Sequence, residues 1–248
     1  MPDDEFEFET PAVDADFFKE GGNTLSETEI ALLGDVNGLS VLVMPAAMGE
    51  EALSLLNMGA KVTVLDSGED LEAVQTLVDE GGFALTLIDD DPNSIDMVNR
   101  KGAFDIVYSP WGAVDWVSNL PDWAVGIADM LRQGGRLIGY DEHPMAYTVE
   151  EDAGRLIVAH SYFGEIIDED EDGEPDTPLA IEGDERSDFS WTIGDLINAL
   201  GNAGLAMVRF DEYPESDRFE TPLDRFMTAD EETLGRVPSA VLFAAIKL

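Results

Sequence analysis

Residues 41–66 read VLVMPAAMGEEALSLLNMGAKVTVLD, and their pattern identifies the fold class. The stretch begins inside the apolar run Leu39–Met44, which is typical of a short strand buried on both faces. Residues Glu50–Met58 then carry apolar side chains at helical spacing and stop before a glycine, a common residue at the end of a helix. A second apolar run, Lys61–Leu65, follows and stops at an aspartate. The order strand, helix, strand predicts two parallel strands joined by a crossover helix.

The same alternation continues along the chain. Further strands are predicted at 83–88, 104–108 and 136–140, and further helices at 67–80, 95–101 and 122–131. After a break, the pattern resumes with a helix at 193–203 and with strands at 205–213 and 240–248, which form a late hairpin. This alternation predicts an α/β fold, a doubly wound and mostly parallel Rossmann-like sheet of about seven strands with helices on both faces. Ligands bind such sheets at the carboxyl ends of the strands.

Two acidic segments lie outside this pattern. Residues 1–28 are predicted to form an acidic N-terminal arm with a helix, ending near the capping signal Ser26-Glu27-Thr28-Glu29, and residues 29–248 form the main domain. Residues 165–188 are an acidic loop inserted into that domain. The part 168–173 copies the start of a calcium-binding loop, but Leu179 stands where such a loop needs a bidentate Glu. No metal site is therefore predicted.

The composition excludes several classes of protein. The chain has 54 Asp and Glu against 13 Lys and Arg, a formal charge of -41, so neither nucleic acid nor an anionic membrane surface is an expected partner. Hydrophobic residues make up 44% of the chain, which is enough to bury a core and excludes a disordered acidic tail. The chain has no Cys, which excludes disulfides and thiolate chemistry. The acidic start of the sequence does not resemble a signal peptide, so a cytoplasmic protein is expected.

The acidic residues are spread over the chain, and only four of the basic residues are Lys (Lys19, Lys61, Lys101 and Lys247). So many like charges repel one another and destabilise the compact state at low ionic strength. In about 1 M salt the screening length falls to roughly 3 Å and the repulsion is suppressed. We therefore expect a halophilic source.

Several segments together resemble the class I S-adenosylmethionine (SAM)-dependent methyltransferases. They are 41–66, then FDIVYSPWGAVDWV (104–117) and LRQGGRLIGYDEHP (131–144), with SYFGE (161–165) and INALGNAGLAMVRFDEYP (197–214) resembling later segments of the family. The resemblance runs from about Leu39 to the C-terminus and covers the order and spacing of these segments. It implies that the protein uses SAM to methylate a small molecule.

In that family the first strand ends in a turn reading roughly D/E-x-G-x-G-x-G, where missing Cβ atoms let the cofactor lie against the backbone. The matching residues here run from Val43 to Gly49. Val43 replaces the acidic residue, Pro45 and Ala47 replace two glycines, and Gly49 is retained. The resemblance places Pro45, Ala47 and Gly49 at the cofactor.

Other cofactor contacts follow from the resemblance at the ends of later strands. Asp66 would accept hydrogen bonds from the ribose hydroxyls, although a cap for the following helix is an alternative role. Asp89, or its neighbour Asp90, would accept from the adenine amino group. Ser109, at the end of the fourth strand, would also lie at the cofactor.

The predicted substrate side holds two aromatic residues and a histidine. Ser109-Pro110-Trp111 is not the N/D-P-P-Y motif of amino methyltransferases, which disfavours methylation of nucleic acids and protein amides. Trp111 and Tyr162 would contact the substrate, with ordinary core packing as the alternative for a Trp. His143, after the fifth strand, is the candidate general base, and a structural loop histidine is the alternative.

Two hypotheses follow. The first is a SAM-dependent methyltransferase that acts on a small molecule. The second is a methyltransferase-like binding or scaffold protein that has lost SAM binding, because Val43, Pro45 and Ala47 depart from the family's turn. The sequence predicts neither the methyl acceptor nor the oligomeric state.

Overall fold

The computed structural model describes residues 14–92, 100–111, 117–163, 191–219, 221–226 and 231–248. Most of the helix predicted at 95–101 and all of the acidic loop at 165–188, including its calcium-like segment, lie outside these residues.

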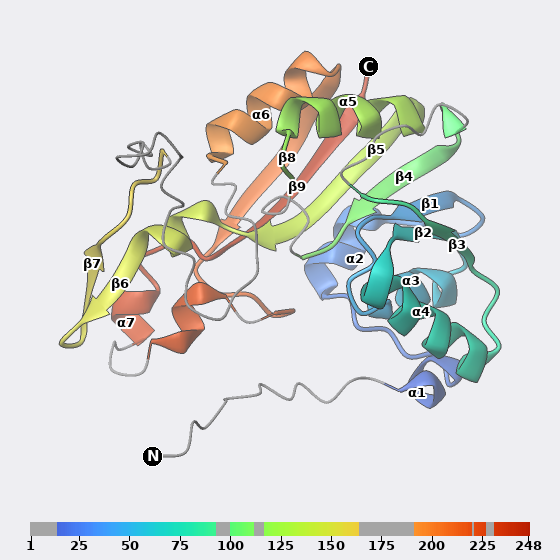
Figure 1. Ribbon diagram of the computed structural model, residues 1–248, viewed down its shortest axis with the longest axis horizontal. Helices are drawn as coiled ribbons and strands as arrows, with labels where there is room; N and C mark the ends of the chain where they lie inside the picture. Colours follow the sequence, from blue (N-terminus) through green and yellow to red (C-terminus); the bar gives the residue numbers. More distant parts are fainter. Residues whose placement is uncertain (1–13, 93–99, 112–116, 164–190, 220, 227–230) are drawn as a thin grey trace, which may run out of the picture.

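A single seven-stranded sheet forms the centre of the molecule, with the strand order β3-β2-β1-β4-β5-β9-β8 (Figure 1). Strands β1 to β5 are parallel, and β9 runs antiparallel to both of its neighbours, β5 and β8. The strands are β1 (Ser40–Val43), β2 (Lys61–Asp66), β3 (Thr86–Asp89), β4 (Phe104–Ser109), β5 (Leu131–Glu142), β8 (Leu205–Tyr213) and β9 (Ala240–Lys247). The predicted α/β fold, its mostly parallel sheet and its late hairpin are confirmed.

Helices cover both faces of this sheet, as the alternation of side chains along β1 shows. Leu42 packs in one core cluster with residues of α5, while Val41 and Val43 pack in a second cluster with residues of α3 and α4. A strand that is apolar at successive positions must be buried on both faces, which explains the continuous apolar runs in the sequence. The helices are α1 (Ala15–Lys19), α2 (Glu27–Leu33), α3 (Glu50–Asn57), α4 (Gly68–Gly81), α5 (Leu120–Met130), α6 (Ile193–Asn202) and α7 (Glu231–Leu234).

Helix α2 packs on the same face of the sheet as α3, because Leu33 lies in the same core cluster as Ala52 and Leu55. Its first turn contacts Tyr108 near the carboxyl end of β4. The predicted capping signal is present: Ser26 accepts from the backbone N–H of Glu29, whose side chain accepts from Ser26. At the other end of the helix, Arg136 of β5 donates to the carbonyls of Leu32 and Leu33 at 3.0 and 2.8 Å. Before α2, helix α1 contacts α3 and α4 and buries Phe18.

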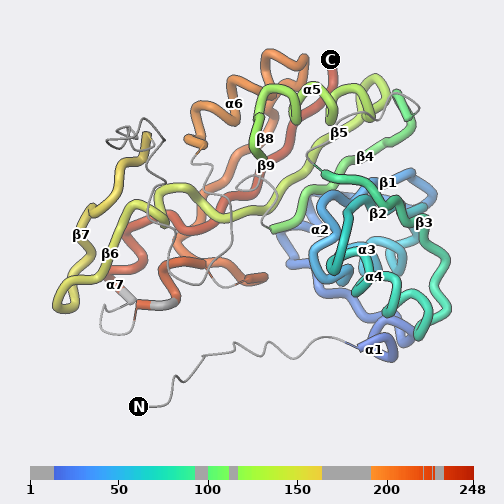
Figure 2. Tube along the Cα trace, viewed as in Figure 1, coloured from blue at the N-terminus to red at the C-terminus, as the bar shows by residue number. Residues whose placement is uncertain are grey.

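Some boundaries differ from those predicted. The sequence predicts a helix at 122–131 and a strand only from 136, but β5 already begins at Leu131, and its register with β4 is irregular at this point. A two-stranded sheet of β6 (Val149–Asp152) and β7 (Arg155–Val158) was not predicted. It lies at the opposite end of the molecule from α3 and α4 (Figure 2). Within the described residues, no helix is long and apolar enough to cross a membrane.

Candidate functional site

The carboxyl ends of four adjacent strands bring the predicted site residues to one edge of the sheet. Val43 at the end of β1 is level with Val64 of β2 and Tyr108 of β4, and Ser109 of β4 is level with Gly139 of β5. The turn after β1, Asp66, Ser109 and the end of β5 therefore share this edge. It is the place where parallel α/β sheets bind ligands.

The turn after β1 keeps a glycine-like backbone although it has lost two glycines. Ala47 has a φ of 47° and Gly49 a φ of 82°, both in the left-handed region that favours glycine. A Cβ on Gly49 would lie 2.9 Å from Val74 Cγ2 of α4, so only glycine fits there. Gly49 is also the N-cap of α3 and makes no side-chain cap, so N–H groups in the first turn of α3, which also carries Glu50 and Glu51, lack a capping side chain.

Asp66 anchors this turn from the end of β2. Its Oδ2 accepts from the backbone N–H of Ala46 at 2.6 Å, and its Oδ1 accepts from the N–H of Ser67 at 2.8 Å. Burial raises the pKa of this carboxyl, and this effect outweighs the two backbone hydrogen bonds, which lower the pKa. Because each carboxylate oxygen can accept more than one hydrogen bond, a ribose could still bind here. The geometry adds a structural role to the predicted cofactor role.

Asp89 and Asp90 lie one strand further out. Asp89 is paired in register with Asp66 and its side chain is exposed. The backbone N–H of Asp90 donates to the carbonyl of Asp66, and its side chain accepts from the N–H of Asp91 at 3.0 Å. Asp89 is therefore the more open of the two carboxylates.

Ser109 ends β4 and is almost fully buried, with 1% of its surface exposed. Its Oγ has no hydrogen-bond partner among the described residues. Since a buried hydroxyl normally has a partner, this atom is suited to a ligand or a bound water.

A buried ionic network beside the turn was not predicted. Arg218 pairs with Glu29 of α2 at 3.1 Å and with Glu51 of α3 at 2.6 Å, and it donates to the carbonyl of Thr24 at 2.5 Å. The hydroxyl of Tyr108, at the end of β4, donates to Glu29 in a short hydrogen bond. Burial raises the pKa of Tyr108 well above its usual value, so its hydroxyl remains protonated. The only signal for this network in the sequence was the capping box that contains Glu29.

The segment that carries Arg218 also reaches the predicted substrate side. Its next residue, Phe219, stacks on Trp111, with ring centroids 5.7 Å apart and an interplanar angle of 17°. The residue before Arg218, Asp217, accepts from the hydroxyl of Tyr140 at 3.0 Å. Burial raises the pKa of Tyr140 to about 12. One short segment thus contacts both sides of the candidate site.

Trp111 lies at the mouth of the site. It is 37% exposed, and its indole N–H donates to Glu142 Oε1 at 2.9 Å. Glu142 and Asp141 end β5 and are both buried. The predicted substrate contact at Trp111 is therefore joined directly to the end of β5.

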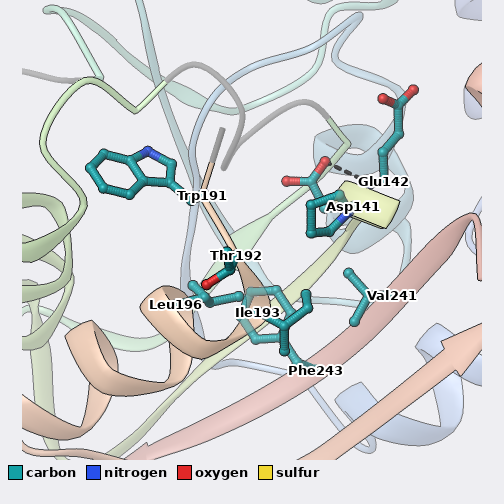
Figure 3. A pocket seen from close by; sticks show the side chains of 9 residues that line it. Asp141, Glu142, Trp191, Thr192, Ile193, Leu196, Val241 and Phe243 are labelled. Carbon is teal, nitrogen blue, oxygen red and sulfur yellow. Dashed lines mark hydrogen bonds between the residues drawn. The ribbon is translucent and has the colours of Figure 1, made fainter. Parts of the chain in front are cut away.

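A pocket of about 290 Å³, part of it open to solvent, lies between the end of β5 and the start of α6. Figure 3 shows Asp141 and Glu142 pointing away from an apolar floor formed by Leu196, Val241 and Phe243. Tyr162 lies next to this pocket, because its hydroxyl accepts from the backbone N–H of Ile193, one of the lining residues. Both predicted substrate residues, Trp111 and Tyr162, are thus hydrogen-bonded to residues that line the pocket.

His143 follows β5, but both of its ring nitrogens have protein partners. Nδ1 accepts from the backbone N–H of Met145 at 3.0 Å, so the proton is on Nε2, which lies 2.9 Å from Glu212 Oε1. Burial lowers the pKa of this histidine, and this effect outweighs the hydrogen bond and charge of Glu212, which raise the pKa. This geometry is that of a structural loop histidine, and a role as general base remains a prediction.

Comparison with known proteins agrees with the fold. A methyltransferase from Mesorhizobium loti that depends on SAM is similar over 87% of this chain and 94% of its own, with 19% identity and a TM-score of 0.63. A Listeria monocytogenes protein assigned as such an enzyme matches 89% of this chain and 97% of its own, with 16% identity and a TM-score of 0.62. A geranyl diphosphate methyltransferase solved with SAM matches 94% of this chain and 84% of its own, with 15% identity and a TM-score of 0.56.

By sequence, neither a family model nor a curated protein matches the chain. The structural similarity nonetheless covers 87% of this chain and 94% of the first of these structures. The chain has the fold of the class I SAM-dependent methyltransferases.

Proposed function

We propose that the protein is a SAM-dependent methyltransferase that acts on a small molecule. The observation that carries this proposal is the convergence of the turn 44–49, Asp66 and Ser109 at one edge of a methyltransferase-type sheet. Fold alone does not identify a function, so these residues and their chemistry are the main support.

The residues at this edge are compatible with the cofactor. The uncapped N-terminus of α3 suits the carboxylate of its amino-acid end, and Asp66 keeps acceptor capacity for the ribose. Asp89 is exposed beside Asp66, where it could accept from the adenine amino group. When bound, SAM would supply an activated methyl group for an in-line displacement. The chain's contribution would be mainly to hold and orient the acceptor.

The acceptor would lie in the pocket between the end of β5 and α6, next to Trp111 and Tyr162. The apolar floor of Leu196, Val241 and Phe243, with Asp141 and Glu142 beside it, has the mixed lining that small-molecule sites use. The strong negative charge disfavours nucleic acid as the acceptor. We further propose that the protein works in concentrated salt in the cytoplasm.

The alternative is a methyltransferase-like protein that binds or scaffolds without catalysis. Two observations favour it: Ala47 keeps a Cβ in a turn where the family has glycine, and both nitrogens of His143 are occupied within the protein.

Calorimetry in multimolar KCl separates the two functions. We expect SAM and S-adenosylhomocysteine to bind the wild-type protein, and Asp66→Ala to abolish most of this binding. The exposed acid Glu69, three residues further along, provides the matched control Glu69→Ala. Absence of heat and of a thermal shift at saturating ligand would overturn the proposal and favour the scaffold.

A further inference from the structure

The turn after β1 has lost the acidic residue with which the family's motif begins, but a different carboxylate lies beside it. Position 43 is a valine with no exposed surface, packed in the core with Ala46 and Ala52. Glu51, two residues after Gly49, is the second residue of α3 and is only 9% exposed. A carboxylate is therefore present next to the turn, supplied by the helix instead of the strand.

The two oxygens of Glu51 differ in their surroundings. Oε1 is paired with Arg218 at 2.6 Å, whereas Oε2 is buried and has no hydrogen-bond partner among the described residues. A buried carboxylate oxygen without a donor is costly, and such atoms usually face a ligand, an ion or a water. In the ionised carboxylate, Oε2 needs a hydrogen-bond donor as its partner.

The charges around Glu51 favour a cationic donor. Two buried carboxylates, Glu29 and Glu51, share one guanidinium, that of Arg218. Glu29 already accepts hydrogen bonds from the hydroxyl of Tyr108 and from the backbone N–H of Ser26, and it is ion-paired with Arg218. When both carboxylates are ionised, this pair therefore carries one negative charge more than Arg218 balances, and an ammonium group at the open oxygen of Glu51 would balance it.

We propose that Glu51 binds the α-ammonium group of the amino-acid end of the sulfonium cofactor through Oε2. This inference rests on the function proposed above. The cofactor's carboxylate would then face the uncapped first turn of the same helix. Arg218 is a positioning residue: its contacts to Glu29, Glu51 and Thr24 hold the Glu51 carboxylate by one oxygen and leave the other for the ligand.

Burial raises the pKa of Glu51, and this effect outweighs the nearby charge of Arg218, which lowers the pKa. Because binding of an ammonium favours the ionised carboxylate, ligand binding at mildly acidic pH should release a proton. This release provides a readout on the unmodified protein.

The experiment compares two ligands that differ only in the amino-acid end. S-Adenosylhomocysteine carries the ammonium and the carboxylate, whereas 5′-methylthioadenosine has neither. Calorimetry in multimolar KCl should show that Glu51→Gln weakens binding of S-adenosylhomocysteine about tenfold to a hundredfold, the usual effect of losing a hydrogen bond to a charged group. Binding of 5′-methylthioadenosine should be unchanged.

The neighbouring acid supplies the control, since Glu50→Gln removes the same charge one residue away and should leave both affinities unchanged. Equal binding of S-adenosylhomocysteine by Glu51→Gln and wild type, or an equal loss for both ligands, would overturn the inference while leaving the proposed function intact. If the wild type binds neither ligand, the proposed function itself fails.

Should Glu51→Gln not fold, as judged by circular dichroism, the wild-type protein still decides the question. Titrations at mildly acidic pH in buffers of different ionisation enthalpy should show a larger proton release with S-adenosylhomocysteine than with 5′-methylthioadenosine, because any release at Asp66 through the ribose is common to both ligands. Equal proton release for the two ligands would overturn the assignment to Glu51.

Discussion

Asp66 and Ala46 are joined by a hydrogen bond of 2.6 Å, from the backbone N–H of Ala46 to Asp66 Oδ2, so the end of β2 holds the turn that follows β1. Replacing Asp66 by Ala leaves this buried N–H without an acceptor. We expect Asp66→Ala to lower the free energy of unfolding by about 1–3 kcal/mol, the cost of an unsatisfied buried donor. Denaturant titration in multimolar KCl measures the loss. If Asp66→Ala and the exposed control Glu69→Ala are equally stable, the anchoring role is wrong.

Arg218 balances two buried carboxylates, and its side chain is only 11% exposed. Removing it as Arg218→Ala leaves Glu29 and Glu51 unpaired, so we expect a loss of about 3–5 kcal/mol in the free energy of unfolding. Arg209 provides the matched control, because its ion pair with Asp211 is exposed and Arg209→Ala should cost less than about 1 kcal/mol. Thermal and chemical unfolding measure both variants. Similar losses of unfolding free energy in Arg218→Ala and Arg209→Ala would contradict this prediction.

The alternation of apolar runs predicted the sheet well because burial on both faces leaves a clear pattern in parallel strands. The helix capping signal at Ser26 was also correct, since it depends only on neighbouring residues. The hairpin of β6 and β7 was not predicted because its strands have only four residues each and are mostly exposed, and the sequence of β6, VEED, is acidic.

The candidate site was harder to predict than the fold. Asp66 and Ser109 could be placed from their positions at strand ends, because the carboxyl ends of parallel strands meet at one edge. Arg218 lies in an irregular segment, and its partner Glu51 is far away in sequence, so no local pattern links the two. In a chain with 54 acids, no single acidic residue stands out until the structure shows which ones are buried.

The pH dependence of stability tests the position of His143. Burial lowers the pKa of this histidine, so the unfolded state binds its proton more readily than the folded state does. The stability that it contributes is therefore present above the ordinary histidine pKa, near 6.5, and is lost as the pH falls below that value. We expect His143→Asn to reduce this acid sensitivity, as measured by denaturant titration over a range of pH.

His160 serves as the control for that experiment, because it is an exposed histidine paired with Glu150 at 3.0 Å. His160→Asn should leave the acid sensitivity close to that of the wild type. Equal changes in both variants would show that the loss on acidification comes from elsewhere. If His143→Asn also keeps methyl transfer within a fewfold of wild type, the prediction of His143 as general base is wrong.

The charge of -41 predicts a strong dependence of stability on salt. Screening shortens the electrostatic range from about 10 Å at 0.1 M salt to roughly 3 Å at 1 M, so the melting temperature should rise steeply with KCl. An uncharged osmolyte such as sucrose, at the same osmolality, should raise it far less, because it does not screen charge. A melting temperature that is the same at low and multimolar KCl would refute the expected halophilic adaptation.

Ala47 and Gly49 both have left-handed backbone in the same turn, with φ of 47° and 82°, but only one of them is glycine. Gly49→Ala should be destabilising by at least about 1–2 kcal/mol, the cost of a left-handed backbone in a residue other than glycine. The added Cβ would also lie 2.9 Å from Val74 Cγ2. Ala47→Gly relieves the same penalty but adds freedom to the unfolded chain, so its stability should stay near that of the wild type.

The same pair tests whether the altered turn limits cofactor binding. Ala47→Gly removes the Cβ at a position where the family lets the cofactor lie against the backbone, so we expect it to bind S-adenosylhomocysteine more tightly than the wild type does. Calorimetry in multimolar KCl measures this change, and Gly49→Ala should bind more weakly in the same titration. If Ala47→Gly binds no better, the Ala47 Cβ does not obstruct the ligand. Equal and measurable affinities would show that the turn accepts the ligand with its alanine in place, because the left-handed backbone at this position is then sufficient.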